Sequence, residues 1–214
     1  FKDTKIIMNL NDLPLLFESK QGVVAIESPI TERFKILEFI HELAQKLCLP
    51  LYFWNEGYSQ LQLFNNNQQL IPTQHQCISG LNWLLQHPDI PGIFVFEGVI
   101  SPDNMTGKLP GQTEMMLSNL VYELATNSVP RFLLFMESYV ELSHSLAPLI
   151  PTLINPLPNP SNIKTLVKNF CNDKFSTTNV NTNQYETLVR TCLGLPLGEL
   201  EMLLKRLSKF TYTL

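Results

Sequence analysis

Short apolar runs alternate with longer, more polar segments through the first 155 residues. The apolar runs predict five strands, at residues 23–28, 49–54, 93–96, 131–136 and 152–155. The segments around them predict helices, at residues 7–18, 32–48, 79–86, 113–126 and 141–149. This alternation predicts an α/β fold, in which right-handed crossovers place helices on both faces of a five-stranded parallel sheet.

The helix expected at residues 32–48 has the clearest period of apolar positions. Its spacing predicts one buried face, made of Phe34, Leu37, Ile40, Leu43, Ala44 and Leu47. In the helix expected at residues 7–18, Asn11 and Asp12 are candidate caps and Pro14 suits its first turn. The polar stretch at residues 65–69 is expected to be a loop.

The pattern changes after Pro156 and Pro158, beyond which only helices are expected. Ser161 is a candidate cap for a helix at 163–170, and a polar segment at 172–183 precedes a helix pair at 184–193 and 197–209. The apolar residues of the last helix form one stripe, made of Leu200, Leu203, Leu204, Leu207 and Phe210. The chain is therefore expected to hold an α/β domain at residues 1–157 and a small helical domain at 158–214.

Composition narrows the range of partners. The chain of 214 residues is 44% hydrophobic and 16% charged, with a net charge of −4. Its longest Lys/Arg run is the pair at 205–206, so neither nucleic acid nor a membrane surface is an expected partner. The high apolar content fits either a surface for a protein partner or a deeply buried sheet.

Two further features bear on location and completeness. The four cysteines, Cys48, Cys77, Cys171 and Cys192, show no CxxC spacing and are expected to be free thiols in a reducing compartment such as the cytoplasm. No apolar run has the 18 or more residues of a membrane span. The chain begins at Phe1 rather than at a methionine, so we expect it to be a fragment of a longer protein.

The junction between the first strand and its helix carries the main departure from a nucleotide-binding pattern. In a P-loop protein it reads GxxxxGK[ST], and the backbone N–H groups and the Lys hold phosphates. Here Ser28 and Pro29 lead directly toward the helix, and no glycine occurs between Gly22 and Gly57. We therefore expect no cofactor at this junction, with ATP bound through a non-standard loop as an alternative.

Two stretches carry a resemblance to a known family. One is RFLLFMES at residues 131–138 with the segment that follows it to residue 158; the other is LVRTCLGLPLGELE at residues 188–201. They resemble AAA-type ATPase modules, and in particular the degenerate N-terminal AAA-like domain of the hypothetical chloroplast reading frame forty-six family of cyanobacteria and plastids. The resemblance covers about residues 10–207.

The resemblance implies a P-loop-type AAA-like sheet with strand order 5-1-4-3-2, followed by a small C-terminal helical lid. It also implies that an intact phosphate loop lies in an adjacent AAA ATPase domain. A link to photosynthetic carbon metabolism and a location in the cytoplasm or plastid stroma follow by association.

The same alignment shows where catalytic residues are replaced. A Mg²⁺-binding strand of this family ends in two acids, whereas residues 97–98 here are Glu97 and Gly98. The polar sensor position is matched loosely by Glu137 or Ser138. Arg206 is either the counterpart of the lid arginine or, with Lys205, part of a solvated basic pair. The chain is therefore expected to be a non-catalytic binding or regulatory domain for a protein partner or an adjacent AAA module, with oligomerisation possible.

Three carboxylates form the alternative catalytic and metal site. Glu27, Glu97 and Glu137 each end an apolar strand, and the strand order above makes those strands neighbours. If the carboxylates meet, they require a proton or a cation such as Mg²⁺, which would suit a metal-dependent phosphoryl or ester hydrolase. If they point apart, they form hydrogen bonds separately. Like-charge repulsion also predicts that Glu97→Gln leaves stability unchanged or raises it.

Overall fold

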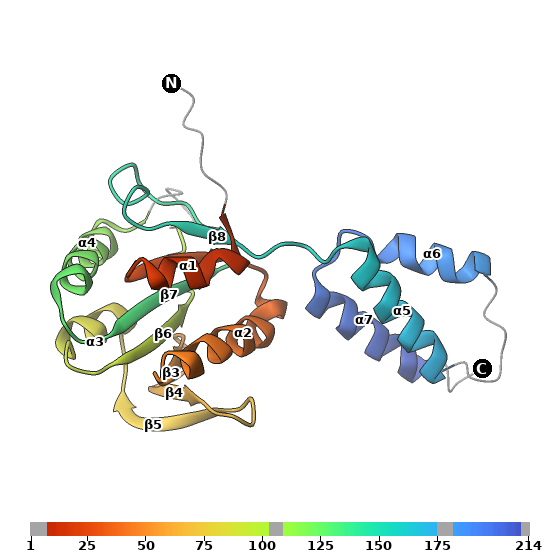
Figure 1. The fold of residues 1–214 in the computed structure, drawn as a ribbon, viewed down its shortest axis with the longest axis horizontal. Coiled ribbons are helices and arrows are strands. Elements are labelled where there is room, and N and C mark those ends of the chain that lie inside the picture. The colour runs from red at the N-terminus through yellow and green to blue at the C-terminus, as the bar shows by residue number, and fades with distance from the viewer. Residues whose placement is uncertain (1–7, 103–108, 175–181, 211–214) are drawn as a thin grey trace. The chain divides into compact units, whose positions relative to one another are not determined.

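The computed structural model describes residues 8–102, 109–174 and 182–210 (Figure 1). The chain divides into two compact units, Phe1–Asn155 and Pro156–Leu214. The first contains the sheet and the second is helical where it is described, so each is treated separately below.

The described part of the first unit contains an eight-stranded sheet. In chain order its strands are β1 (Met8–Asn9), β2 (Val23–Glu27), β3 (Leu51–Trp54), β4 (Gln60–Phe64), β5 (Leu70–Gln76), β6 (Gly92–Glu97), β7 (Arg131–Glu137) and β8 (Thr152–Ile154). Their order across the sheet is β1-β8-β2-β7-β6-β3-β4-β5. Neighbours from β8 to β3 pair in parallel. These five are the strands expected from the sequence, and their order confirms 5-1-4-3-2.

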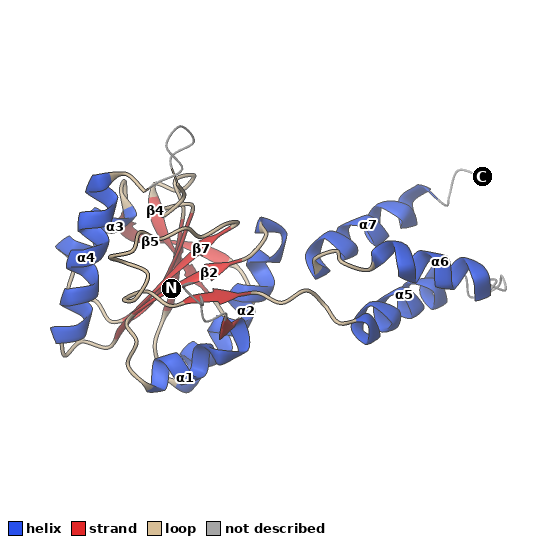
Figure 2. Cartoon of the chain, turned by 90° about the horizontal axis from the view of Figure 1, so that it is seen from above, coloured by secondary structure: helices blue, strands red, loops and turns tan. Residues whose placement is uncertain are grey.

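Helices cover both faces of the sheet (Figure 2). They are α1 (Leu13–Glu18), α2 (Arg33–Lys46), α3 (Gly80–Gln86) and α4 (Gly111–Thr126). Alternate strand residues point to opposite faces, so Val24 and Ile26 of β2 pack with α1 and α2, whereas Val23 and Ala25 pack with α3 and α4. The short apolar runs of the sequence are thus strands buried on both sides.

Residues 49–86 contain a hairpin that the sequence analysis did not predict. Strands β4 and β5 pair with each other in antiparallel fashion, and β4 pairs with β3, at the edge of the parallel sheet. The Asn-rich loop at 65–69 is its turn, where the side chain of Asn65 accepts hydrogen bonds from the backbone N–H groups of Asn67 and Gln69. The alternating QLQLF of β4 was the signal for a half-buried strand.

Two expected helices differ in the structure. Met8 and Asn9 form a strand that pairs with β8, so α1 begins only at Leu13, after a 3-10 turn (η1, Leu10–Asp12) that Asn9 caps. Residues 141–149 form hydrogen-bonded turns instead of a helix. There the hydroxyls of Ser143 and Ser145 both donate to Glu114 of α4, so these turns are held by a contact with another helix.

The buried face of α2 is narrower than its apolar pattern indicated. Leu37, Ile40 and Ala44 are fully buried, as expected. Phe34 and Leu47 are exposed instead, at 50% and 43%. Phe34 lies in the first turn of α2, beside the 3-10 turn η2 (Ile30–Glu32) that connects β2 to this helix.

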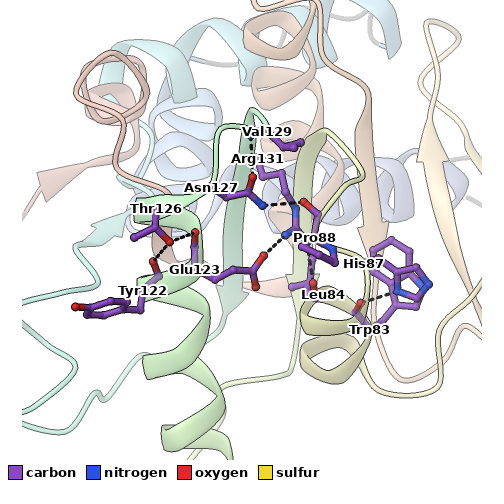
Figure 3. Close-up of polar contacts among 10 residues, drawn as sticks. All are labelled: Trp83, Leu84, His87, Pro88, Tyr122, Glu123, Thr126, Asn127, Val129 and Arg131. Atoms are coloured by element: carbon purple, nitrogen blue, oxygen red, sulfur yellow. Dashed lines mark hydrogen bonds and ion pairs between the residues drawn. The ribbon is translucent and has the colours of Figure 1, made fainter.

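A buried arginine ties the start of β7 to two helices (Figure 3). The guanidinium of Arg131 donates to the Glu123 carboxylate of α4 at 2.7 Å and to the carbonyl of Leu84 in α3 at 3.0 Å. It also lies 5.6 Å from the centre of the Phe94 ring. Burial lowers the pKa of Arg131, and the charge of Glu123 opposes that shift. Arg131 therefore anchors the helical layer at the end of the sheet away from the carboxyl ends of the strands.

The second unit packs α5 (Pro160–Lys174), α6 (Thr182–Cys192) and α7 (Leu197–Phe210) around a core of its own. All three were expected as helices, but α5 continues into the segment expected to be a polar linker. Its cap is Asn159, whose side chain accepts from the backbone N–H of Asn162, and not Ser161. Of the apolar stripe on α7, Leu200 and Leu204 are buried, whereas Leu203 and Leu207 are 42% and 45% exposed. No helix among the described residues is long and apolar enough to cross a membrane.

Candidate functional site

A cavity of about 600 Å³ lies at the carboxyl ends of the parallel strands. Its lining comes from the segments that follow β2, β3, β6 and β7. The polar side chains among its lining include Ser28, Arg33, Asn55, Glu97 and Glu137. In open α/β sheets ligands bind at this edge, so the cavity is the candidate site.

Glu97 ends β6 and forms an ion pair with Arg33, the first residue of α2. The guanidinium donates through Nε at 2.8 Å and through Nη2 at 2.5 Å, one bond to each carboxylate oxygen. The amide of Asn55 adds a third hydrogen bond at 2.9 Å. Such a two-point arginine–carboxylate pair is among the stronger charged contacts in proteins. Both oxygens of Glu97 are thus occupied by a cation from the same chain.

Glu137 ends β7 and is 3% exposed. One of its oxygens accepts from the backbone N–H of Ile100 at 2.8 Å, and the other from the hydroxyl of Ser101 at 2.6 Å. Burial raises the pKa of Glu137, while these hydrogen bonds and one from the backbone of Val99 lower it. The charge of Glu97 adds a smaller upward contribution to that pKa. Glu137 therefore fixes the loop after β6.

Glu27 ends β2 and stands beside Glu137 in the register of the sheet. Its carboxylate accepts from the backbone N–H of Val140 at 3.1 Å, in the loop after β7. Glu27 is not among the residues that line the cavity. Its carboxylate fixes a loop, as that of Glu137 does.

The alternation along the strands divides the three strand-end glutamates between the two faces of the sheet. Ala25 of β2 and Phe135 of β7 pack with α3 and α4, so Glu27 and Glu137, two residues further on, continue on that face. Val95 of β6 packs with α1 and α2, and Glu97 continues on this opposite face, where Arg33 lies. Within the described ranges, no group of three His, Cys, Asp or Glu side chains is placed to hold a metal ion. Metal binding by Glu27, Glu97 and Glu137 stays a prediction.

The junction between β2 and α2 has few backbone donors to offer. The N–H of Ser28 donates to the carbonyl of Glu137 at 2.8 Å, and Pro29 has no N–H. The N–H of Glu32 donates to the carbonyl of Pro29 at 3.0 Å, which closes the 3-10 turn η2. The hydroxyl of Ser28 accepts from the amide of Asn155 at 3.1 Å. A phosphate would therefore find most of this segment's donors engaged or missing.

Sequence reasoning missed Arg33 and Asn55. The position of Arg33 could have been predicted, because it begins the helix after β2, at the edge where the strands end. Asn55 directly follows β3, so its position at the same edge could also have been predicted. Glu137 and Ser138, the two residues matched loosely to the polar sensor, both line the cavity. Arg206, matched to the lid arginine, is an exposed residue of α7.

No known family profile and no curated protein matches the sequence. Among solved structures, a single-residue variant of RuvB from Thermotoga maritima matches with a TM-score of 0.52 at 13% identity, over 93% of this chain and 59% of that one. The fold resembles an AAA+ domain. At this identity the similarity shows the fold alone, and the chain spans only 59% of RuvB's length.

Two other matches have TM-scores below 0.5 and carry no argument. One is a HORMA, CdnC and Trip13 complex of Escherichia coli, with a TM-score of 0.46 at 11% identity, over 78% of this chain and 57% of that one. The other is a DNA replication initiation factor, with a TM-score of 0.48 at 8% identity, over 94% of this chain and 61% of that one. The cavity thus lies at the carboxyl edge of an AAA+-like sheet, and its chemistry must be argued from its own residues.

Proposed function

We propose that this chain is a non-catalytic AAA-like domain that binds or regulates a protein partner or an adjacent AAA ATPase module. The observation that carries the proposal is the two-point ion pair between Arg33 and Glu97. It gives the strand-end carboxylate an internal counter-ion at the edge where an AAA-type domain would use a bound cation.

The ion pair opposes metal binding at Glu97 for an electrostatic reason. A carboxylate binds Mg²⁺ through its oxygens, and here both accept hydrogen bonds from the positive guanidinium of Arg33. A divalent ion would have to displace that cation or lie beside it. The following residue, Gly98, supplies no second acid. Hydrolysis through this strand end therefore has neither a free carboxylate nor a general base.

Nucleotide binding is opposed by the junction before α2. Its sequence lacks GxxxxGK[ST], Pro29 removes one donor, and the amides of Ser28 and Glu32 are used within the fold. A phosphate is held in P-loop proteins by free backbone amides and a lysine together. The domain is therefore proposed to act through its surfaces.

The finer assignment to the degenerate N-terminal domain of the chloroplast reading frame forty-six family is part of this proposal. It rests on the phrases at residues 131–138 and 188–201. The associated location in cytoplasm or plastid stroma and the link to photosynthesis depend on that assignment alone. In this proposal, ATPase activity belongs to an attached or partner AAA module.

Calorimetric titration with Mg-ATP tests the proposal directly. We expect binding no tighter than about millimolar, which corresponds to about −4 kcal/mol. The Arg33→Met variant is the informative companion, because it leaves the Glu97 carboxylate without its internal cation. A micromolar dissociation constant for wild type would overturn the proposal. Weak Mg-ATP binding by wild type, together with stronger Mg²⁺ binding by Arg33→Met than by wild type, would support the proposal.

A further inference from the structure

Helix α4 exposes a regular stripe of uncharged side chains. Its members follow one another at spacings of three and four residues, which keeps them on one side of the helix, and all are exposed: Gln112, Met115, Asn119, Tyr122 and Thr126. We name these five residues the α4 stripe. Leu117 and Leu120, on the other side of the helix, are buried in the core.

Two apolar side chains of the α4 stripe are largely open to solvent. Met115 is 65% exposed and Tyr122 is 78% exposed. Figure 3 shows the ring of Tyr122 directed away from Glu123 and Arg131. The two side chains are seven positions apart, which is about two helical turns. A partner that covered both of them would remove this apolar area from water.

The charged residues of α4 are engaged with other elements. Its two acids are Glu114, which accepts from two serine hydroxyls of the loop after β7, and Glu123, which pairs with Arg131. The helix contains no Lys or Arg. Residues 57–88, which include the neighbouring helix α3, contain no Asp, Glu, Lys or Arg. The α4 stripe is therefore a neutral face on a charged unit.

Charge decides which partner this face suits. The unit Phe1–Asn155 has eight Lys and Arg residues against fifteen Asp and Glu, a net charge of −7. Two copies of it repel each other least where neither presents a charge. The helical unit of the same chain exposes Lys205 and Arg206 beside Leu203 on α7, and a charge buried against a neutral face loses its hydration without gaining a counter-ion. The α4 stripe of another copy avoids that cost.

The α4 stripe is also complementary to itself. Asn119 is at its centre, with Met115 four residues before it and Tyr122 three residues after it. In an antiparallel pair with a two-fold axis beside Asn119, Met115 of each copy meets Tyr122 of the other. A methionine sulfur beside an aromatic ring is a favourable contact, and two facing asparagine amides can each donate and accept. A parallel pair would instead place each of these side chains against its own equivalent.

We propose that the α4 stripes of two copies of this chain pack together in antiparallel fashion about a two-fold axis at Asn119. Each copy uses the same surface, so assembly stops at a dimer. The 16 residues of α4 span about 24 Å, so the interface is at the small end of the range for specific complexes and the dimer is weak. The inference rests on the proposed function, in which the domain acts through its surfaces, and names one partner for it.

Salt should strengthen this dimer. The contact itself contains no charge, whereas the two acidic units repel each other, and salt screens that repulsion. In sedimentation velocity we expect wild type to shift from monomer to dimer as its concentration rises. The shift should be larger at about 0.5 M salt than at about 0.05 M salt.

Cysteine cross-linking tests the position of the axis. In a full-length chain whose exposed Cys48 is replaced by serine, Asn119→Cys should form a disulfide-linked dimer under mild oxidation, because the axis brings the two copies of residue 119 together. Gln112→Cys is the matched control, at another exposed position of the same stripe. Its two copies would lie about 21 Å apart, beyond the reach of a disulfide. A parallel pair would link both variants, and a stripe covered by the helical unit or by another protein would link neither.

An added charge tests the contact without a cross-link. Tyr122→Glu should abolish the dimer, because it buries a carboxylate in a neutral interface. Leu15→Glu is the control: it makes the same kind of change at a 61% exposed position of α1 and should form the dimer as wild type does. Both variants should melt close to wild type, since both positions are exposed.

Four results would each overturn the inference. They are a wild type that is monomeric at every concentration, an association that weakens with salt, equal cross-linking or none in Asn119→Cys and Gln112→Cys, and equal loss of the dimer in Leu15→Glu and Tyr122→Glu. Such a failure is distinct from failure of the proposed function, because the Mg-ATP titration does not involve α4.

Discussion

Arg33 binds Glu97 through two hydrogen bonds of 2.8 and 2.5 Å, one to each carboxylate oxygen. The arginine begins α2 and the glutamate ends β6, so the pair joins two elements 64 positions apart in the sequence. Arg33 also lies 5.5 Å from the centre of the ring of Phe53, a residue of the strand that pairs with β6. The pair therefore fixes the start of α2 at the edge where the cavity lies.

Removal of the Arg33 guanidinium should destabilise the fold. In Arg33→Met the Glu97 carboxylate, which is 13% exposed, keeps only its bond from Asn55. We expect a loss of about 1–3 kcal/mol in the free energy of unfolding, measured by urea denaturation at pH 7. Arg190→Met is the control, because its ion pair with Glu186 is exposed and 4.0 Å long; it should change stability by less than about 0.5 kcal/mol. Equal effects in both variants would contradict a structural role for Arg33.

Glu97→Gln separates the inert domain from the metal-dependent enzyme. Like-charge repulsion predicted unchanged or higher stability, but the nearest charge to Glu97 is the guanidinium of Arg33, so the structure leads us to expect a loss. Thermal melts with and without millimolar Mg²⁺ or Mn²⁺ provide the test. For an inert domain, neither protein should change its melting temperature when metal is added. A metal-dependent rise in wild type alone would restore the strand-end carboxylates as a real site.

The sequence predicted the sheet better than the site, for a physical reason. Strands buried on both faces, such as β6 and β7, produce apolar runs that any α/β chain must contain, and their order follows from the resemblance. The β4–β5 hairpin was missed because its strands are rich in glutamine and only partly buried. The turns at 141–149 were predicted as a helix because the contact that holds them, from Ser143 and Ser145 to Glu114, is made with a different helix.

The sequence left open whether the strand-end carboxylates meet or point apart, because strand position alone does not assign a residue to a face of the sheet. Glu27, Glu97 and Glu137 all end strands, as predicted, but Glu97 projects toward α2 while the other two lie on the opposite face. Two residues before these glutamates lie Ala25, Val95 and Phe135. Once each of these three is assigned to a face of the sheet, the glutamates that follow are separated as well. Face assignment requires the packing of helices, which apolar runs alone do not supply.

Glu137 should make stability depend on pH. Burial raises its pKa above the ordinary value of 4.5, so the native state favours the protonated form more than the unfolded chain does. Its contribution is thus fully present below pH 4.5 and is lost as the pH rises through the raised native pKa. Glu137→Gln removes this dependence, because a neutral amide can still accept from Ile100 and donate to Ser101.

Urea denaturation from about pH 4 to pH 8 checks that sign. The free energy of unfolding of Glu137→Gln minus that of wild type should grow with pH, by about 1.4 kcal/mol for each pH unit between the unfolded and native pKa values of Glu137. Glu42→Gln, at an exposed position of α2, is the control and should give a constant difference. A difference that falls with rising pH would mean that hydrogen bonds outweigh burial at Glu137.

Arg131→Ala should be the most damaging of these substitutions. It removes the two hydrogen bonds that join β7 to α3 and α4, and it leaves the carbonyl of Leu84 without its partner. Glu123 is 24% exposed, so water can hydrate its freed carboxylate and part of the cost is recovered. We expect a loss of about 3 kcal/mol in the free energy of unfolding. Arg131→Lys keeps the charge but lacks the fork that reaches two acceptors, so it should recover less than half of that loss. Recovery by Lys to the wild-type value would mean that charge alone, and not the paired geometry, anchors the helices.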